Sequence, residues 1–170
     1  QNPDCRLTNS SGAYGTTISE HLIMVCLMLL RRQMEYTEII RAGGWETLPG
    51  GIRSLHGARI TVFGTGDIGT EFARRAQAFH PACITGVRRT VRSSDPAFTS
   101  IHAIAELDSV LPETDILVMA LPSTAETVGI LSRERIALLP DSAFVVNVGR
   151  GTAIDQEALC DALNAGQLAG

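Results

Sequence analysis

The stretch ARITVFGTGDIG, residues 58–69, decides the fold of this chain. Its first six residues form an apolar run typical of a buried strand, and the next six carry three glycines in the pattern G-x-G-x-x-G. Downstream, Phe72, Ala76 and Phe79 recur at helical spacing. The order strand, glycine turn, helix predicts a dinucleotide-binding unit, with a ligand-free glycine turn as the alternative.

Each glycine of the turn has a separate task in such a unit. Gly64 permits the tight turn, Gly66 lets a pyrophosphate approach the backbone, and Gly69 lets the helix close on the strand. The helix start at Asp67 and Ile68 would direct unpaired N–H groups at the phosphates. We expect the Asp67 carboxylate to point away from the phosphates or to cap the helix, because an acid there suits the helix dipole.

Composition describes one globular domain of 170 residues, with 45% hydrophobic residues, 19% charged residues and a net charge of −4. The absence of a basic stripe argues against nucleic-acid binding. The longest apolar run, Leu22–Leu30, is too short to cross a bilayer and lacks the basic flank of a signal peptide. Four separated cysteines without metal-ligand spacing predict free thiols in a reducing, cytoplasmic setting: Cys5, Cys26, Cys83 and Cys160.

After residue 58 the chain alternates expected strands and helices. Further strands are predicted over 83–87, 115–121 and 143–147, and helices over 104–111, 132–139 and 155–166. Ser132 and Asp155 are expected to cap the last two helices, and Gly166 to end the last one. The alternation predicts an α/β fold with a doubly wound parallel sheet.

The N-terminal part has a different pattern. Thr17-Ile-Ser-Glu20 matches a capping box and starts a helix that is apolar nearly all round. Such a helix is expected to be buried by its own domain on one side and by something else on another. Gly43-Gly44 ends the helical stretch, and residues 45–51 form a loop into the first strand.

The end of the second predicted strand bears on the choice of coenzyme. An NAD-binding unit places an acid there, about twenty residues after the last glycine of the turn, to bond the ribose hydroxyl. This position falls at Arg88, followed by Arg89 and Thr90, with no acid before Asp95. Two arginines and a hydroxyl suit a 2′-phosphate, so NADP(H) is favoured over NAD(H). A solvated basic loop is the alternative.

Further motifs follow one another along the chain. They are Ser19-Glu-His21 with Trp45, Ala120-Leu-Pro122 with Glu126-Thr127, Asn147-Val-Gly-Arg-Gly151 with Ile154-Asp155, and Gln167–Gly170. Together with the glycine turn they resemble, over essentially the whole chain, the cofactor domain of the D-isomer-specific 2-hydroxyacid dehydrogenases. The resemblance implies a Rossmann-type domain over residues 17–170 after an interdomain crossover segment over 1–16. It also implies that the last strands and the substrate domain of the complete fold are missing.

The resemblance also assigns site residues. It makes Arg150 the substrate-orienting residue, whereas spacing alone would leave it a surface arginine in a β–α loop. The family's catalytic glutamate and histidine have no counterpart in this chain. The coenzyme contacts implied by the motifs, beyond the glycine turn, are Ala120, Leu121, Pro122, Thr127, Val148, Gly149 and Arg150 itself.

The implied parent protein is an oxidoreductase that transfers hydride between NADP(H) and a small 2-hydroxy or 2-oxo acid of the glyoxylate or hydroxypyruvate type. The alternative is a dinucleotide-binding regulator of the same fold. This chain is expected to bind a dinucleotide without turnover, because the acid–base pair is absent. It is also expected to form a homodimer through helix 17–33, with Leu22 and Val25 or a neighbouring stripe at the contact, unless a substrate domain covers that face.

Overall fold

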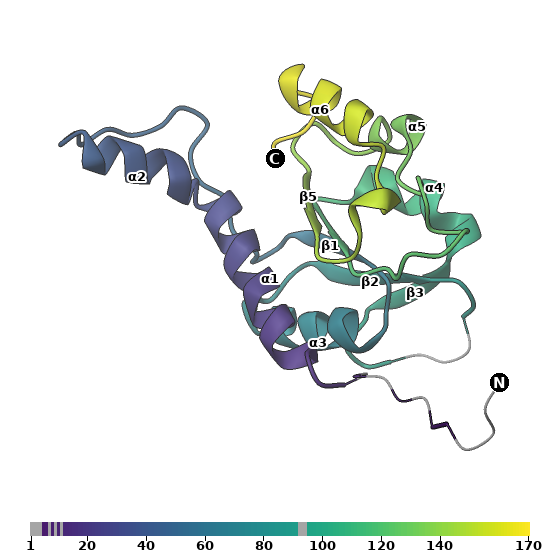
Figure 1. Ribbon diagram of the computed structural model, residues 1–170. Helices are drawn as coiled ribbons and strands as arrows, with labels where there is room; N and C mark the ends of the chain where they lie inside the picture. Colours follow the sequence, from purple (N-terminus) through teal and green to yellow (C-terminus); the bar gives the residue numbers. More distant parts are fainter. Residues whose placement is uncertain (1–4, 7, 9, 11, 92–94) are drawn as a thin grey trace.

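One parallel sheet organises the molecule (Figure 1). The computed structural model describes residues 5–6, 8, 10, 12–91 and 95–170, and part of the expected crossover segment lies outside them. The strands lie in the order β3-β2-β1-β4-β5 and all pair in parallel, which confirms the predicted α/β class. They are β1 (Arg59–Phe63), β2 (Cys83–Arg88), β3 (Ser100–Ala103), β4 (Ile116–Met119) and β5 (Phe144–Asn147).

The strand order changes direction at the centre of the sheet. From β1 the chain moves outward through β2 to β3, then returns to place β4 on the other side of β1. All four residues of β4 are buried, as its continuous apolar run predicts for a strand covered on both faces. The connections that follow β1 and β4 lead to helices on opposite faces of the sheet. The crevice between these connections, at the carboxyl ends of the strands, is where open α/β sheets bind ligands.

Helices cover both faces of the sheet (Figure 1). On one face lie α1 (Gly15–Leu30) and α3 (Asp67–Ala76), and on the other lie α4 (Leu107–Val110), α5 (Arg133–Ile136) and α6 (Gln156–Asn164). Successive residues of β1 alternate between the two resulting cores, with Ile60 and Val62 in the first and Phe63 in the second. None of the helices within the described ranges is long and apolar enough to cross a membrane.

Short elements account for the main differences from the sequence expectations. β3 was not expected, because its four residues are all only partly buried and carry no clear apolar alternation. The helix expected over 104–111 is divided into η2 (Ile104–Glu106), α4 and η3 (Leu111–Glu113). Two further 3₁₀ turns are η1 (Gln77–Phe79), which follows α3, and η4 (Gly151–Ala153), which follows β5.

Two of the three predicted helix signals behave as expected. The Asp155 carboxylate accepts a hydrogen bond from the Ala158 N–H at 3.0 Å, and Gly166 adopts a φ of +68° just after α6. Ser132 occupies the N-cap position of α5, but its hydroxyl donates to the Glu134 carboxylate at 2.7 Å instead of capping the backbone. α5 also ends at Ile136, three residues earlier than expected.

The capping box predicted at the start of the first helix is wrong. α1 begins at Gly15 after Tyr14, so Thr17 already lies within the first turn and its hydroxyl donates back to the Tyr14 carbonyl at 3.3 Å. The helical stretch then breaks at Arg32, whose φ of +53° is left-handed, before α2 (Gln33–Arg41) begins. Gly43, with a φ of +74°, ends the stretch as predicted.

The prediction of which α1 residues would contact a partner chain is partly wrong. Leu22 is 0% exposed and belongs to the core between α1, α3 and the sheet, so it is not available to a second chain. Val25 is only partly buried, and Met24 is 48% exposed. α2 contains no buried residue, and Figure 1 shows it projecting away from the body of the domain.

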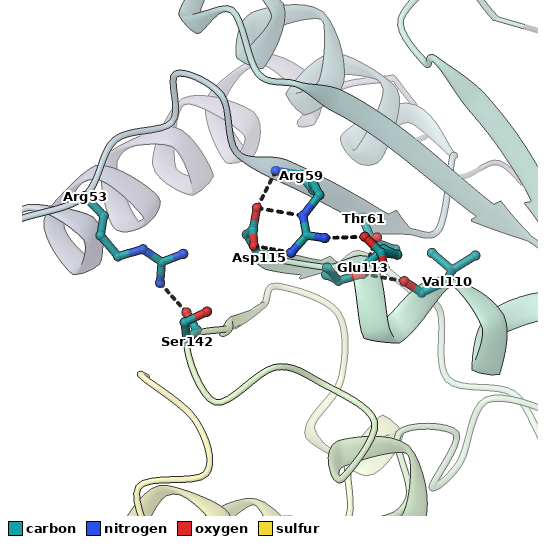
Figure 2. Close-up of polar contacts among 8 residues, drawn as sticks. Arg53, Arg59, Thr61, Val110, Glu113, Asp115 and Ser142 are labelled. Atoms are coloured by element: carbon teal, nitrogen blue, oxygen red, sulfur yellow. Dashed lines mark hydrogen bonds and ion pairs between the residues drawn. The ribbon is translucent and has the colours of Figure 1, made fainter.

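The amino ends of β1 and β4 are joined by side chains (Figure 2). Asp115 accepts hydrogen bonds from the Arg59 backbone N–H at 2.8 Å and from the guanidinium at 2.9 Å, and Glu113 pairs with the same guanidinium. The Thr61 and Thr114 hydroxyl oxygens, between the same two segments, lie 2.7 Å apart. The hydrogen bonds from Arg59 hold the pKa of Asp115 below its usual range.

Candidate dinucleotide-binding site

Two adjoining cavities lie at the carboxyl edge of the sheet and share Gly66, Leu121 and Pro122. Their volumes of about 640 and 530 Å³ are within the range of small-ligand sites. All the predicted site residues except Gly69 line one cavity or the other. The first cavity contains Gly64, Gly66, Arg88, Arg89, Thr90, Leu121, Pro122 and Thr127; the second contains Gly66, Asp67, Ile68, Ala120, Leu121, Pro122, Val148, Gly149 and Arg150.

The three glycines of the turn have different reasons to be glycine. Gly64 has a φ of +106°, and a Cβ there would lie 2.6 Å from the Ala120 carbonyl oxygen. A Cβ on Gly69 would lie 2.0 Å from the Gly64 carbonyl oxygen, so this residue lets α3 close on β1. A Cβ on Gly66 would meet nothing within 4 Å. Gly64 and Gly69 are therefore required by the fold, whereas Gly66 leaves open space on the cavity side.

Asp67 begins α3, directly after Gly66 at the N-cap position. Its carboxylate lies against the first turn of α1, where a Cβ on Gly15 would be 2.6 Å from Asp67 Oδ2. This contact at the start of a helix suits the helix dipole. It also places the carboxylate beside α1.

The end of β2 carries the predicted cations. Arg88 is partly buried, and Arg89 and Thr90 are exposed on the wall of the first cavity. Among the described residues, no carboxylate lies within ion-pair distance of either arginine. Arg92, which completes the basic stretch, lies outside the described residues. The two guanidinium groups are therefore available to an anion.

Thr65 was missed as a site residue, although it lies within the glycine turn. Its methyl group packs against Gly86, where a Cβ would be 2.6 Å from Thr65 Cγ2. The Thr65 hydroxyl oxygen is buried and has no hydrogen-bond partner among the described residues. An unpaired buried hydroxyl is costly and uncommon in a native structure, and here it adjoins the cavity.

The loop after β4 forms the opposite wall of the first cavity. The Thr127 hydroxyl donates to the Pro122 carbonyl at 2.7 Å and accepts from the Thr124 N–H at 2.9 Å, so the loop is fixed by its own contacts. Glu126 in this loop also lines the cavity. It was not assigned a role from the sequence, although it was part of a recognised motif. The pKa of Glu126 is lowered by hydrogen bonding from the Thr124 side chain and from the Glu126 backbone, and by the positive charge of nearby Arg89.

Arg150 lies in the turn between β5 and η4, on the wall of the second cavity. The Asn147 side chain fixes this turn, because its amide donates to the Arg150 carbonyl at 3.1 Å and its oxygen accepts from the Gly149 N–H at 2.9 Å. A Cβ on Gly149 would lie 2.6 Å from the Leu121 carbonyl oxygen, so the loops after β4 and β5 are in close backbone contact. The Arg150 side chain is exposed and bonds only to the Gly149 carbonyl, at 3.2 Å, among the described residues.

These features together fit a dinucleotide. The glycine turn and the start of α3 suit a pyrophosphate, and the open space at Gly66 allows close approach to the backbone. The arginines at the end of β2 would lie at the adenosine end, and Arg150 at the nicotinamide end.

Comparison with known proteins agrees with this architecture. The family model for the NAD binding domain of D-isomer specific 2-hydroxyacid dehydrogenases matches residues 23–170. A glyoxylate/hydroxypyruvate reductase B from Pectobacterium atrosepticum is 33% identical over 159 residues, which are 89% of this chain and 48% of the relative. The chain thus spans about half the length of the curated relatives it matches.

Solved structures show the same similarity. A D-isomer specific 2-hydroxyacid dehydrogenase from Xanthobacter autotrophicus Py2, in complex with NADPH and MES, has a TM-score of 0.82 at 29% identity, covering 98% of this chain and 68% of that one. An NADPH-dependent glyoxylate/hydroxypyruvate reductase from Sinorhizobium meliloti has a TM-score of 0.81 at 25% identity, covering 97% and 81%. The chain belongs to the D-isomer specific 2-hydroxyacid dehydrogenase family, whose NAD-binding domain it carries.

Proposed function

We propose that this chain is the coenzyme domain of an NADPH-dependent reductase that acts on small 2-oxo acids of the glyoxylate or hydroxypyruvate type. The observation that carries the proposal is the placement of Arg88, Arg89 and Thr90 in the same cavity as the glycine turn. The names of the Pectobacterium and Sinorhizobium relatives support the substrate class, and the NADPH-bound Xanthobacter structure supports the coenzyme.

The basic end of β2 would select the coenzyme. A 2′-phosphate there would receive charge-assisted hydrogen bonds from the two guanidinium groups and a further bond from the Thr90 hydroxyl. The position at the end of β2 that would bond a ribose 2′-hydroxyl in an NAD enzyme holds Arg88 instead of an acid. The local charge therefore favours NADP(H) over NAD(H).

Arg150 would hold the substrate. Its guanidinium stays charged at all ordinary pH values and presents a planar set of donors that suits the carboxylate and carbonyl oxygens of a 2-oxo acid. When the coenzyme is bound, its nicotinamide ring supplies the hydride. Arg150 would polarise the carbonyl that accepts it, and the Asn147 contacts would keep the arginine-bearing turn in place.

The coenzyme assignment is tested by changing Arg88 and Arg89 together to Ala and measuring NADPH and NADH dissociation constants for this chain. Each charge-assisted hydrogen bond contributes about 1.5–3 kcal/mol, so NADPH binding should weaken at least about tenfold while NADH binding changes little. A control pair, Arg41→Ala with Arg133→Ala, removes two surface arginines that pair with Glu38 and Asp161 away from the cleft. Equal losses for both coenzymes would refute the assignment.

The choice between an enzyme and a regulator is tested in the longer parent protein. Reduction of glyoxylate or hydroxypyruvate with NADPH, lost on Arg150→Ala, is the expected result. A parent protein that binds NADPH tightly and reduces neither acid would favour the regulator. This chain alone should bind the coenzyme without turnover.

We also propose that the chain pairs with a second copy of itself through α1 and the projecting arm of residues 33–52. Trp45 in this arm is 100% exposed, and Met34 and Ile40 are exposed as well. A cavity of about 480 Å³ opens beside it, lined among others by Met28, Leu29, Met34 and Phe144. Apolar side chains and an apolar cavity on one face suit a two-fold contact.

Sedimentation at micromolar concentration tests this pairing. A dimer in which Trp45→Ser weakens association is the expected result, with Val128→Ser as the control because Val128 is exposed on the loop after β4. A wild-type chain that sediments as a clean monomer would rule out the pairing.

A further inference from the structure

One acidic residue lines the same cavity as the basic end of β2. Glu126, on the loop after β4, lines this cavity together with Arg88, Arg89 and Thr90. It comes from a different part of the sequence, and the return of the chain from β3 to β4 brings its loop to the same cavity as the end of β2. Its loop is held by the Thr127 hydroxyl, which bonds to both the Pro122 carbonyl and the Thr124 N–H. The carboxylate is thus placed by a fixed loop.

The charge state of this side chain is also defined. Hydrogen bonds from the Thr124 side chain and from its own backbone, with Arg89 near it, hold the pKa of Glu126 below its usual range. The carboxylate is therefore ionised at neutral pH. Glu126 and Arg89 are nevertheless not within ion-pair distance, since the described ion pairs do not join them. The cavity wall thus carries, besides the two arginines, a negative charge that no described ion pair joins to them.

We infer that Glu126 limits the preference for phosphorylated coenzyme, because its carboxylate opposes a 2′-phosphate held by Arg88 and Arg89. The inference rests on the proposed function, in which that phosphate binds at the end of β2. A 2′-phosphate in the cavity would gain attraction from the arginines and meet repulsion from the carboxylate across the same space. A coenzyme with a 2′-hydroxyl carries no charge at this position, so its affinity would not depend on the charge of Glu126. Glu126 therefore changes the difference in binding affinity between the phosphorylated and the unphosphorylated coenzyme.

The test uses two small probes that isolate this end of the coenzyme, 2′,5′-ADP and 5′-AMP, with binding measured by calorimetry. Glu126→Gln keeps the shape of the side chain and removes its charge. We expect 2′,5′-ADP to bind about three- to tenfold more tightly and 5′-AMP to stay within about twofold, as for charges that interact near a solvent-exposed surface. The gain should shrink between about 0.1 M and about 1 M salt, because the Debye length falls from about 10 Å to about 3 Å.

Two control variants complete the experiment. Glu126→Asp keeps the charge and should keep the wild-type preference, whereas Glu157→Gln removes an exposed carboxylate on α6, outside the cavity, and should change neither dissociation constant. Thermal denaturation of each variant verifies that the fold is unchanged.

The outcomes separate this inference from the proposed function. If 2′,5′-ADP binds and depends on Arg88 and Arg89, but Glu126→Gln changes neither probe or both equally, the role of Glu126 is refuted and the coenzyme proposal stands. If 2′,5′-ADP binds no better than 5′-AMP, and the Arg88 and Arg89 substitutions leave both unchanged, the coenzyme proposal fails and the inference fails with it.

Discussion

The two ends of the central strands contain similar residues in opposite situations. At the amino end, Arg59 is paired with Asp115 and Glu113, and the Thr61 hydroxyl is paired with that of Thr114 (Figure 2). At the carboxyl end, no carboxylate lies within ion-pair distance of Arg88, Arg89 or Arg150 among the described residues. The buried Thr65 hydroxyl there also has no partner in the described part of the chain.

This difference separates groups that stabilise the domain from groups that are available to a ligand. A buried or half-buried polar group without a partner costs free energy, so a fold keeps such groups only where something else satisfies them. The amino end satisfies its own arginine and threonines with neighbouring side chains. Around the two cavities at the carboxyl end, the described residues leave Arg88 and Arg89 without an ion-pair partner and the buried Thr65 hydroxyl without a hydrogen bond. Substitutions at the amino end should therefore change stability, and most substitutions at the carboxyl end should change binding.

The largest effect is expected within the glycine turn, where Gly64 and Gly69 are exceptions to this rule because the fold requires them. Gly69→Ala should lower the free energy of unfolding by about 3 kcal/mol or more, because its Cβ would lie 2.0 Å from the Gly64 carbonyl oxygen and backbone must move. Gly66→Ala, whose Cβ meets nothing within 4 Å, should leave stability nearly unchanged and weaken NADPH binding. Denaturant titration and coenzyme titration of both variants check this. Wild-type NADPH affinity in Gly66→Ala would contradict the placement of the pyrophosphate.

An intermediate effect is expected at the amino end. Asp115→Asn should destabilise the chain by about 1–2 kcal/mol at neutral pH, since it removes charge from the bonds that Arg59 donates. The folded pKa of Asp115 is depressed, so its contribution is full above the unfolded value of about 3.9 and is lost as the pH falls through the folded pKa. The stability difference between wild type and variant should therefore shrink as the pH is lowered below about 4.

Denaturant titrations at neutral and acidic pH measure this difference, and coenzyme binding serves as the control. A variant with unchanged stability at neutral pH would mean that the ion pair only offsets its own desolvation. If folded Asp115→Asn bound coenzyme more weakly, this would contradict the view that the amino end serves stability and the carboxyl end serves binding.

The smallest effect on stability is expected from a threonine-to-valine substitution made separately at each end of the central strands. Thr61→Val removes a hydroxyl that bonds to Thr114, and should cost about 1 kcal/mol of stability. Thr65→Val removes a buried hydroxyl without a described partner, and should be neutral or slightly stabilising in the absence of coenzyme. Thermal unfolding of the two variants compares them directly. Equal destabilisation by both would show that the Thr65 hydroxyl is satisfied in solution.

Sequence patterns predicted the parts of the fold that depend on interactions between residues close in the sequence. The Asp155 cap and the glycine at 166 were read correctly because a cap and a left-handed residue are decided within one turn of helix. The buried strand β4 was evident from its unbroken apolar run. The capping box at Thr17 failed because α1 begins at Gly15, which packs against Asp67 far along the chain. β3 was missed because four partly buried residues at a sheet edge carry no periodic signal.

The features of the candidate site also divide into those that the sequence predicted and those that only the structure revealed. The sequence by itself located the glycine turn between β1 and α3 and the cations at the end of β2, because each lies in a short run with a local pattern. Arg150 was assigned only through the resemblance of several motifs in order, since spacing alone would leave it a surface arginine. Only the tertiary structure decided that Glu126 lines the same cavity as those cations, that the Thr65 hydroxyl is buried without a described partner, and that Leu22 is covered by its own domain. These facts depend on which distant segments the parallel sheet brings together, and strand order and helix docking are set by packing over the whole domain.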